Sequence, residues 1–129
     1  MTETKGTVLV VDDEDSVRQV AEEILRYLGY TALTAPSGDC AVELLRGGAR
    51  PDVVLLDLIM PGMNGFQTLQ AIRAIDPDVP VLITTGYADR AASQSLVSEG
   101  ADGFVNKPYQ IETLAAHLEK TCQAGRRPK

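Results

Sequence analysis

Short runs of apolar residues alternate with helix-period segments from one end of the chain to the other. In residues 8–11 and 53–56, every position is apolar rather than every second one. Such continuous runs are typical of strands that are covered on both faces, as in the parallel sheet of an α/β protein. The alternation therefore predicts βαβ units around a central parallel sheet.

Five pairs of strand and helix can be counted along the chain. The strand at 30–35 is less apolar than the others, so we expect it near an edge of the sheet. The helix at about 88–98 has only Leu96 and Val97 as large apolar residues, so we expect it to be weakly anchored. The expected strands cover residues 7–11, 30–35, 53–56, 79–84 and 104–105, and the expected helices about 16–28, 38–46, 66–75, 88–98 and 111–121. Gly29 is the expected stop of the first helix, and Ser37 is the expected N-cap of the second.

The residues that come just after the apolar strands are mostly polar. In an open parallel sheet, ligands bind beyond the carboxyl ends of the strands, where the strand order reverses. We therefore expect these residues to meet at one edge of the sheet. They are Asp12, Asp13, Asp57, Thr85, Gly86, Asn106 and Lys107.

Three of these residues are aspartates, Asp12, Asp13 and Asp57. Carboxylates that share one site repel each other and are costly to desolvate unless a cation lies among them. A small number of hard oxygen ligands suits Mg²⁺, which keeps several waters and binds one or two carboxylates together with phosphate oxygens. The alternative for residues 12–15 is an acidic helix start that complements the helix macrodipole, and the residues alone leave both interpretations open.

Asp57 directly ends a buried apolar strand, where a carboxylate has little reason to be present for packing. A loop-capping role is the alternative. A carboxylate can attack phosphorus and form an aspartyl phosphate when nearby cations neutralise the charge of the phosphoryl oxygens. Lys107 supplies such a cation, Thr85 a hydroxyl donor, and Gly86 leaves room for the phosphate. Taken singly, Lys107 could be a surface lysine and Thr85 a β-forming threonine, but the joint arrangement indicates a phosphoacceptor site.

The length of 129 residues, with 44% hydrophobic and 23% charged residues, predicts one soluble globular domain. We expect its core at about 7–121 and a frayed tail at 122–129. The net charge of -6 opposes binding to nucleic acid or to an anionic membrane surface. No apolar run suggests a membrane span or a signal peptide, so a cytoplasmic location is expected. Cys40 and Cys122 are expected to be free thiols.

The blocks VLVVDDE, LLDLIMPGMNG, ITTGY and GFVNKPY occur in this order and resemble the response-regulator receiver domains of two-component signalling. The resemblance extends over nearly all of residues 7–121 and is specific, because four separate blocks agree in type, order and spacing. It implies an α/β fold of the flavodoxin-like kind. In that fold a doubly wound, five-stranded parallel sheet has the order 2-1-3-4-5, with helices on both faces.

The resemblance also implies a function. A receiver is a phosphoacceptor and not a conventional enzyme: it catalyses its own phosphorylation and dephosphorylation, with Mg²⁺ as the cofactor and Mn²⁺ as a substitute. The phosphoryl group would pass from the phosphohistidine of a sensor histidine kinase, or of a histidine phosphotransfer domain, to Asp57. Asp12, Asp13, Asp57 and the backbone carbonyl of Ile59 match the metal ligands of the family.

Thr85, Gly86 and Lys107 match the family's phosphate-binding positions, and Lys107–Pro108 would be a cis peptide. Phosphorylation would draw Thr85 toward the phosphate and let the aromatic ring of Phe104 turn inward. This change would reshape the face made by the helix at about 88–98, the strand at 104–105 and the helix at 111–121. The family also allows a homodimer through this face.

Two residues depart from the best-known chemotaxis-type pattern, Ile59 and Tyr87. Both flank the path of the water that would attack the phosphoryl group. An apolar Ile59 cannot hold this water by hydrogen bonding, so we predict slow self-dephosphorylation. The only histidine, His117, lies on the last helix away from the acids and is expected to be a partly exposed helix residue.

Three other functions share features with this sequence. A phosphatase-type hydrolase would use Asp12 as its nucleophile instead of Asp57. A flavodoxin-like cofactor binder needs a phosphate loop rich in hydroxyls or glycine after the first strand, where this chain has residues 12–14, Asp-Asp-Glu. A pseudo-receiver would never take phosphate. No output domain follows in the sequence, so we expect a stand-alone regulator, a fragment, or the terminal receiver of a hybrid sensor kinase.

Overall fold

The computed structural model describes residues 6–57, 65–85, 102–106 and 109–124, and within them the side chains of Thr85, Phe104, Asn106 and residues 122–124 are not described. In these residues, five parallel strands form one sheet in the order β2-β1-β3-β4-β5. This is the order that the family resemblance implies. The strands are β1 (Thr7–Val11), β2 (Thr31–Ala35), β3 (Val53–Asp57), β4 (Val81–Thr85) and β5 (Gly103–Asn106).

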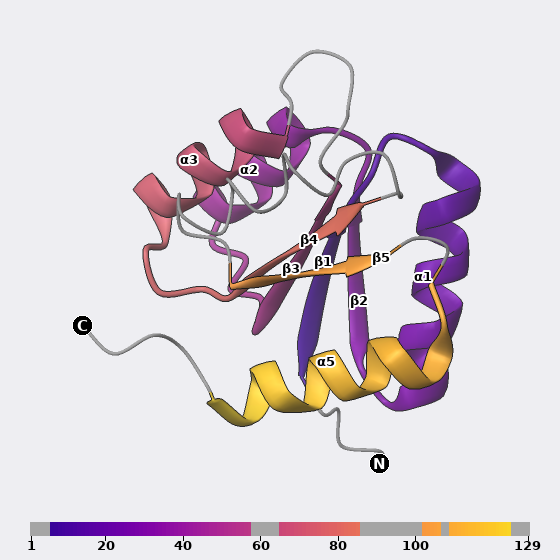
Figure 1. Cartoon of the computed structure of the whole chain (residues 1–129). Helices are drawn as coiled ribbons and strands as arrows, with labels where there is room; N and C mark the ends of the chain where they lie inside the picture. The colour runs from indigo at the N-terminus through magenta and orange to yellow at the C-terminus, as the bar shows by residue number, and fades with distance from the viewer. Residues whose placement is uncertain (1–5, 58–64, 86–101, 107–108, 125–129) are drawn as a thin grey trace.

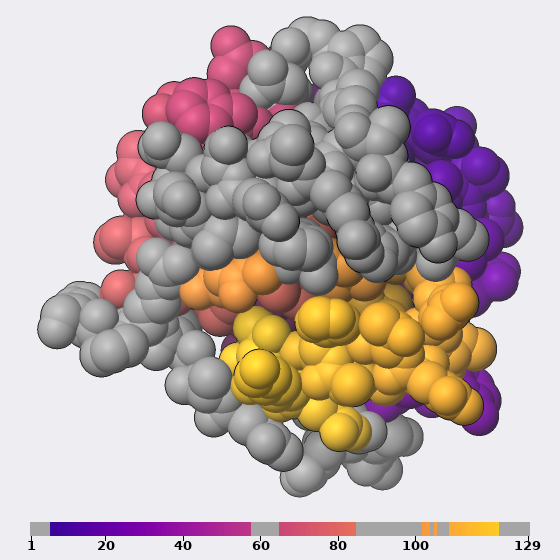
Figure 2. Space-filling model, in the orientation of Figure 1, coloured from indigo at the N-terminus to yellow at the C-terminus, as the bar shows by residue number. Residues whose placement is uncertain are grey.

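Helices cover both faces of the sheet, as Figure 1 shows. One face carries α1 (Asp15–Leu28) and α5 (Ile111–Ala124), and the other carries α2 (Gly38–Arg46) and α3 (Gly65–Ile75). In the space-filling view of Figure 2, α5 forms the lower front of the molecule, with α1 on the right and α3 at the upper left. The helix predicted at about 88–98 lies outside the described residues.

The continuous apolar runs are explained by two cores, one on each side of the sheet. Leu9 and Val11 of β1 pack with α2 and α3, whereas Val8 and Val10 pack with α1 and α5. None of these four side chains is more than 1% exposed. A strand needs apolar residues at successive positions when both of its faces are buried, which is the pattern seen in the sequence.

Local signals set several element boundaries as the sequence predicts. The side chain of Ser37 accepts a hydrogen bond of 3.2 Å from the N–H of Cys40 and so caps α2. Gly29 ends α1 with a φ of 97°, a left-handed conformation that glycine adopts without strain. The edge strand β2 is less buried than β1, in agreement with its less apolar sequence.

Two predicted boundaries differ from the structure by more than one residue. The fourth strand begins at Val81 and not at Val79, because the carbonyl oxygen of Val79 accepts a hydrogen bond from Arg73 of α3. The last helix continues to Ala124, past the predicted end at Thr121. The sequence has no glycine or proline between Thr121 and Ala124 that would stop it. None of the described helices has the length and apolarity needed to span a membrane.

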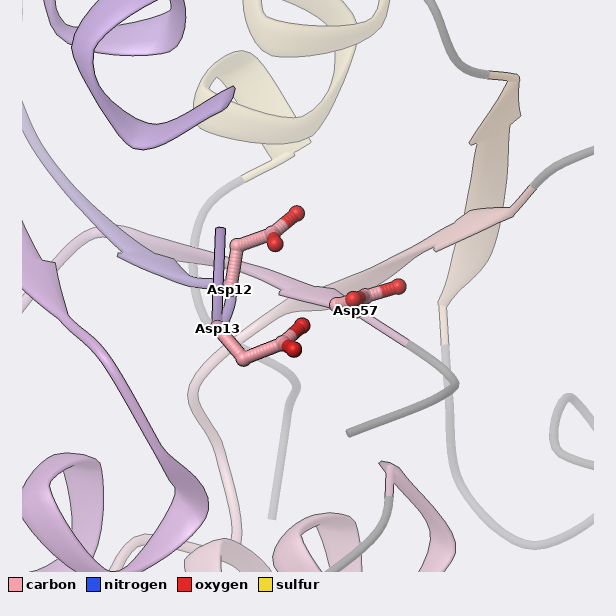
Figure 3. A group of neighbouring side chains, drawn as sticks. All are labelled: Asp12, Asp13 and Asp57. Atoms are coloured by element: carbon pink, nitrogen blue, oxygen red, sulfur yellow. The ribbon is translucent and has the colours of Figure 1, made fainter. Parts of the chain in front are cut away.

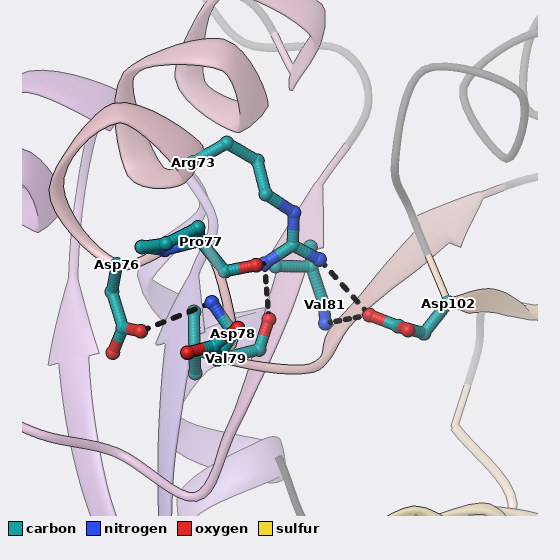
Figure 4. Close-up of polar contacts among 7 residues, drawn as sticks. All are labelled: Arg73, Asp76, Pro77, Asp78, Val79, Val81 and Asp102. Carbon is teal, nitrogen blue, oxygen red and sulfur yellow. Dashed lines mark hydrogen bonds and ion pairs between the residues drawn. The ribbon is translucent and has the colours of Figure 1, made fainter. Parts of the chain in front are cut away.

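An aspartate fastens the amino-terminal end of two strand pairs in the same way. The N–H of Thr7 in β1 donates to Asp52 at 2.7 Å, and the N–H of Asp52 donates back to the carbonyl of Thr7 at 2.8 Å. Asp102 repeats this exchange with Val81 of β4, at 2.8 Å in both directions. Figure 4 marks the bond from the N–H of Val81 to the carboxylate of Asp102. Asp102 also binds Arg73 at 3.0 Å. These contacts fix the register at the edge of the sheet opposite to the predicted site.

Candidate functional site

The strand register brings three aspartates together at the carboxyl edge of the sheet. Val11 of β1 pairs with Leu56 of β3, so the residues that follow them, Asp12 and Asp57, are neighbours. Asp13 extends from the same turn as Asp12. One carboxylate oxygen of each of these aspartates lies within 4.8 Å of those of the other two. Figure 3 shows the three carboxylates projecting toward the same side of the sheet edge. The convergence predicted from the sequence is therefore present for all three acids.

Burial distinguishes this cluster from an ordinary group of surface acids. Asp12 is fully buried and Asp57 is 6% exposed, whereas Asp13 is exposed. Two negative charges held close together in a site of low solvent access repel each other, and each loses hydration energy. A divalent cation with oxygen ligands offsets both costs, and carboxylates at this spacing offer it the ligand atoms it needs. The donor set fits Mg²⁺.

The turn between β1 and α1 holds Asp12 in place. The N–H of Asp12 donates to the carbonyl of Ala35 at 3.1 Å. The N–H of Glu14 donates to Oδ1 of Asp12 at 3.0 Å, while Glu14 itself is the N-cap residue of α1 and makes no side-chain cap. Of the acidic run at 12–15, only Asp15 lies in the first turn of the helix. Complementing the helix dipole therefore accounts for Asp15 but not for Asp12 and Asp13.

The structure describes the remaining predicted site residues only in part. Thr85 and Asn106 end β4 and β5 and are register partners, so their backbones reach the same sheet edge as Asp57. The backbone of Phe104 pairs with Ile83 within the sheet. The predicted site residues Ile59, Gly86, Tyr87, Lys107 and Pro108 lie outside the described residues.

Two residues near the cluster were not singled out from the sequence. Thr84 is the register partner of Asp57, and its hydroxyl oxygen is buried with no hydrogen-bond partner among the residues that the structure describes. Arg18 of α1 donates from Nη1 to the backbone carbonyl of Asp12 at 2.6 Å. The spacing of Arg18 three residues after Asp15 was a signal for an ion pair on one helix face, but nothing in the sequence signals a contact with a carbonyl six residues earlier.

Residues predicted to have no part in the site agree with the structure where they are described. His117 is half-buried on α5, as expected for a helix residue that is partly exposed. Cys40 is a free thiol of intermediate exposure that packs against the core between the sheet and the α2–α3 layer. The side chain of Cys122 is not among the described ones.

Comparison with known proteins gives a consistent result. The model of the response regulator receiver domain family matches residues 8–119. The chain is 40% identical over 116 residues to the probable transcriptional regulator ycf27 of Guillardia theta, covering 90% of this chain and 45% of that protein. It is 36% identical over 119 residues to the sensor kinase CckA of Brucella abortus, covering 92% of this chain and 13% of that protein. The chain thus spans less than half the length of either relative.

A solved structure agrees in fold over nearly its whole length. The crystal structure of a response regulator receiver domain protein from Clostridium thermocellum superposes with a TM-score of 0.86 at 28% identity. The superposition covers 92% of this chain and 94% of the other. The similarity in fold therefore extends over nearly all of both chains.

Proposed function

The chain belongs to the family of response regulator receiver domains, the signalling domains of two-component systems, and from this premise we propose that it is a phosphoacceptor in which Asp57 receives a phosphoryl group. The donor is the phosphohistidine of a sensor histidine kinase or of a histidine phosphotransfer domain. The observation that carries this proposal is the close approach of Asp12, Asp13 and Asp57 at the carboxyl edge of the sheet, with two of the three buried.

Asp12, Asp13 and Asp57 would hold Mg²⁺, and the backbone carbonyl of Ile59 would complete the protein's share of the ligands. When bound, the ion supplies positive charge that offsets the negative charge of the carboxylates and of the phosphoryl oxygens. The fit is supported by the carboxylate spacing of at most 4.8 Å and by the burial of two of the three acids, whose mutual repulsion a cation would offset.

Asp57 is the nucleophile in this proposal because it ends β3 and lies at the centre of the sheet edge. One of its carboxylate oxygens forms a bond to phosphorus as the P–N bond of the phosphohistidine breaks. The imidazole leaves with the bonding electron pair and takes up a proton from solvent. The ammonium group of Lys107 and the hydroxyl group of Thr85 are proposed, from their places in the sequence, to bind the transferred phosphoryl oxygens. Gly86 gives the phosphate room.

The signal would leave the site through Thr85 and Phe104. Their backbones lie on β4 and β5, which are paired in the sheet, so a movement of one strand end would act on the other. We propose that the face including β5 and α5 presents the phosphorylated form to a downstream protein or to a second copy of the chain. Ile59 is proposed to slow the loss of phosphate, because its apolar side chain cannot hold the attacking water by hydrogen bonding, and Tyr87 is proposed to flank the same path.

Intact-mass measurement after incubation with Mg²⁺ and acetyl phosphate tests the phosphoacceptor proposal. The wild-type chain should gain the mass of one phosphoryl group, and Asp57→Asn should gain none, because an amide oxygen is a poor nucleophile. Asp39→Asn makes the same change at an exposed aspartate in the first turn of α2 and should behave as wild type.

The same experiment separates the rival functions. Peptide mapping that places the adduct on Asp12 would favour the phosphatase-type hydrolase. An adduct that persists in Asp57→Asn would move the acceptor elsewhere. No adduct on the wild type, with phosphohistidine donors as well as acetyl phosphate, would favour a pseudo-receiver.

A further inference from the structure

Arg18 lies in the first turns of α1, directly beside the turn that carries two of the three aspartates. Its Nη1 donates to the backbone carbonyl of Asp12 at 2.6 Å, and its Nη2 pairs with the carboxylate of Asp15. The side chain of Arg18 is only 15% exposed, whereas that of Asp15 is 92% exposed. Arg18 is therefore a largely buried cation whose guanidinium bridges the turn and the helix.

The contact with Arg18 completes a set of bonds that fixes Asp12 at three points. The N–H of Asp12 is bound to Ala35, its carbonyl oxygen to Arg18, and its Oδ1 to the N–H of Glu14. Arg18 also donates its own backbone N–H to the carbonyl of Glu14 at 3.1 Å. The turn from Asp12 to Arg18 is thus closed on itself, by side-chain contacts as well as by backbone bonds.

The peptide group that joins Asp12 to Asp13 is the part of the turn that Arg18 holds. This group cannot rotate without breaking the bond between the guanidinium and the carbonyl of Asp12. Its orientation sets the directions in which both carboxylates leave the backbone, and both project to the same side as Asp57 in Figure 3. A group that orients ligands without touching the ion is worth a large factor in metal affinity.

We propose that Arg18 is a positioning residue for the cation site: it holds the Asp12–Asp13 peptide so that the two carboxylates converge on Asp57. The proposal rests on the function proposed above. Arginine suits this role because its planar guanidinium has N–H donors in fixed directions and can bind a carbonyl and a carboxylate at once. A lysine ammonium is a compact charge without that fixed geometry.

If Arg18 acted only through its charge, its removal would change the Mg²⁺ affinity in the opposite direction. Arg18 carries a positive charge near the site, so removing it would strengthen the binding of a divalent cation if only Coulomb's law acted. If Arg18 acts by positioning, its removal loosens the turn and weakens binding. The sign of the change in Mg²⁺ affinity therefore separates the two roles.

Isothermal titration of the apo protein with Mg²⁺ measures this sign. Arg18→Met removes both the charge and the hydrogen-bond donors of the guanidinium. It should raise the Kd for Mg²⁺ about tenfold, the low end of the range for groups that orient metal ligands. Arg18→Lys keeps the charge but loses the planar guanidinium that binds two groups at once, so it should raise the Kd by less than Arg18→Met does. Arg26→Met removes an equal charge from the last turn of the same helix, where Arg26 pairs with Glu22 at 2.7 Å, and should leave the Kd unchanged.

The kinetics of phosphorylation by acetyl phosphate give a second readout. In the Arg18 variants, the Mg²⁺ concentration for half-maximal rate should rise by the same factor as the Kd. The rate at saturating Mg²⁺ should stay within about twofold of wild type, because added ion restores the population of correctly placed carboxylates. Thermal melting of each apo variant shows that it is folded, and Arg18→Lys decides the question if Arg18→Met does not fold.

Two results would overturn the proposal. One is a lower Kd in Arg18→Met, which would assign Arg18 an effect through charge. The other is a reduced melting temperature with an unchanged Kd, which would make Arg18 a purely structural residue. A wild-type chain that neither binds Mg²⁺ nor gains a phosphoryl group would instead contradict the proposed function, so the two failures can be told apart.

Discussion

At the scale of single residues, Thr84 places a buried hydroxyl group directly beside the proposed acceptor. Thr84 and Asp57 are register partners on neighbouring strands. Their side chains therefore lie on the same face of the sheet. The hydroxyl oxygen has no partner among the described residues. A buried polar group without a hydrogen bond costs about 1–3 kcal/mol. Of the two adjacent threonines, Thr85 is the proposed phosphate ligand, and Thr84 has the buried hydroxyl group without a hydrogen bond.

Thr84→Val keeps the shape of the side chain and removes the hydroxyl group. We expect this variant to raise the free energy of unfolding by about 1 kcal/mol in urea titrations, because no hydrogen bond is lost. An equal or lower stability would show that the hydroxyl group is bonded in solution. Acetyl phosphate labelling of the variant should still occur, since Thr84 has no assigned part in the transfer.

The positions of the three aspartates could be predicted from the sequence, whereas the contact made by Arg18 could not. Asp12, Asp13 and Asp57 were predictable because each follows an apolar strand, and parallel strands end at the same edge of a sheet. The role of Arg18 was not predictable in this way. Its contact is to a backbone carbonyl, and backbone groups leave no trace in the amino-acid pattern.

At the scale of elements, the two reciprocal aspartate contacts fasten β1 to the start of β3 and β4 to the start of β5. Asp102 differs from Asp52 in one respect, because it also binds the guanidinium group of Arg73, whose side chain is only 15% exposed. Arg73 in turn reaches the carbonyls of Pro77 and Val79 (Figure 4). Asp102 therefore connects three elements, α3, β4 and β5, whereas Asp52 connects two strands.

Replacing each aspartate by alanine compares the two contacts. Asp52→Ala should lower the free energy of unfolding by about 1 kcal/mol, the value of one hydrogen bond. Asp102→Ala should lower it by about 2–3 kcal/mol, because it also leaves a mostly buried guanidinium without its carboxylate. Urea unfolding measures both. Equal losses in the two variants would mean that the pair between Arg73 and Asp102 contributes nothing to stability.

The contacts of Arg73 also show why the start of one strand could not be predicted from the sequence. The fold class, the strand positions and the edge location of β2 follow from hydrophobic pattern alone. The start of β4 does not, because Val79 fits the apolar pattern of the strand but its carbonyl is bound to Arg73 of α3. A contact between residues on different elements is set by tertiary packing, which local pattern does not report.

At the scale of the whole molecule, the two edges of the sheet have opposite effects on stability. The amino edge is stabilised by Asp52 and Asp102, whose carboxylates each accept a backbone hydrogen bond from a neighbouring strand. The carboxyl edge brings three carboxylates together in a chain that already has a net charge of -6, so repulsion among them opposes folding, and a bound cation would relieve it. Binding of Mg²⁺ to the folded state alone would then stabilise the fold by RT ln(1 + [Mg²⁺]/Kd).

Thermal melting with and without Mg²⁺ tests this linkage. At a concentration of ten times the Kd, the ion should add about 1.4 kcal/mol to the free energy of unfolding of the wild-type chain. Asp57→Asn should be more stable than wild type without Mg²⁺, because it removes one buried charge from the cluster, and should gain less from the ion. NaCl at the same ionic strength controls for screening. If NaCl raises the melting temperature of wild type as much as Mg²⁺ does, the carboxyl edge holds no specific cation and its acids are only screened.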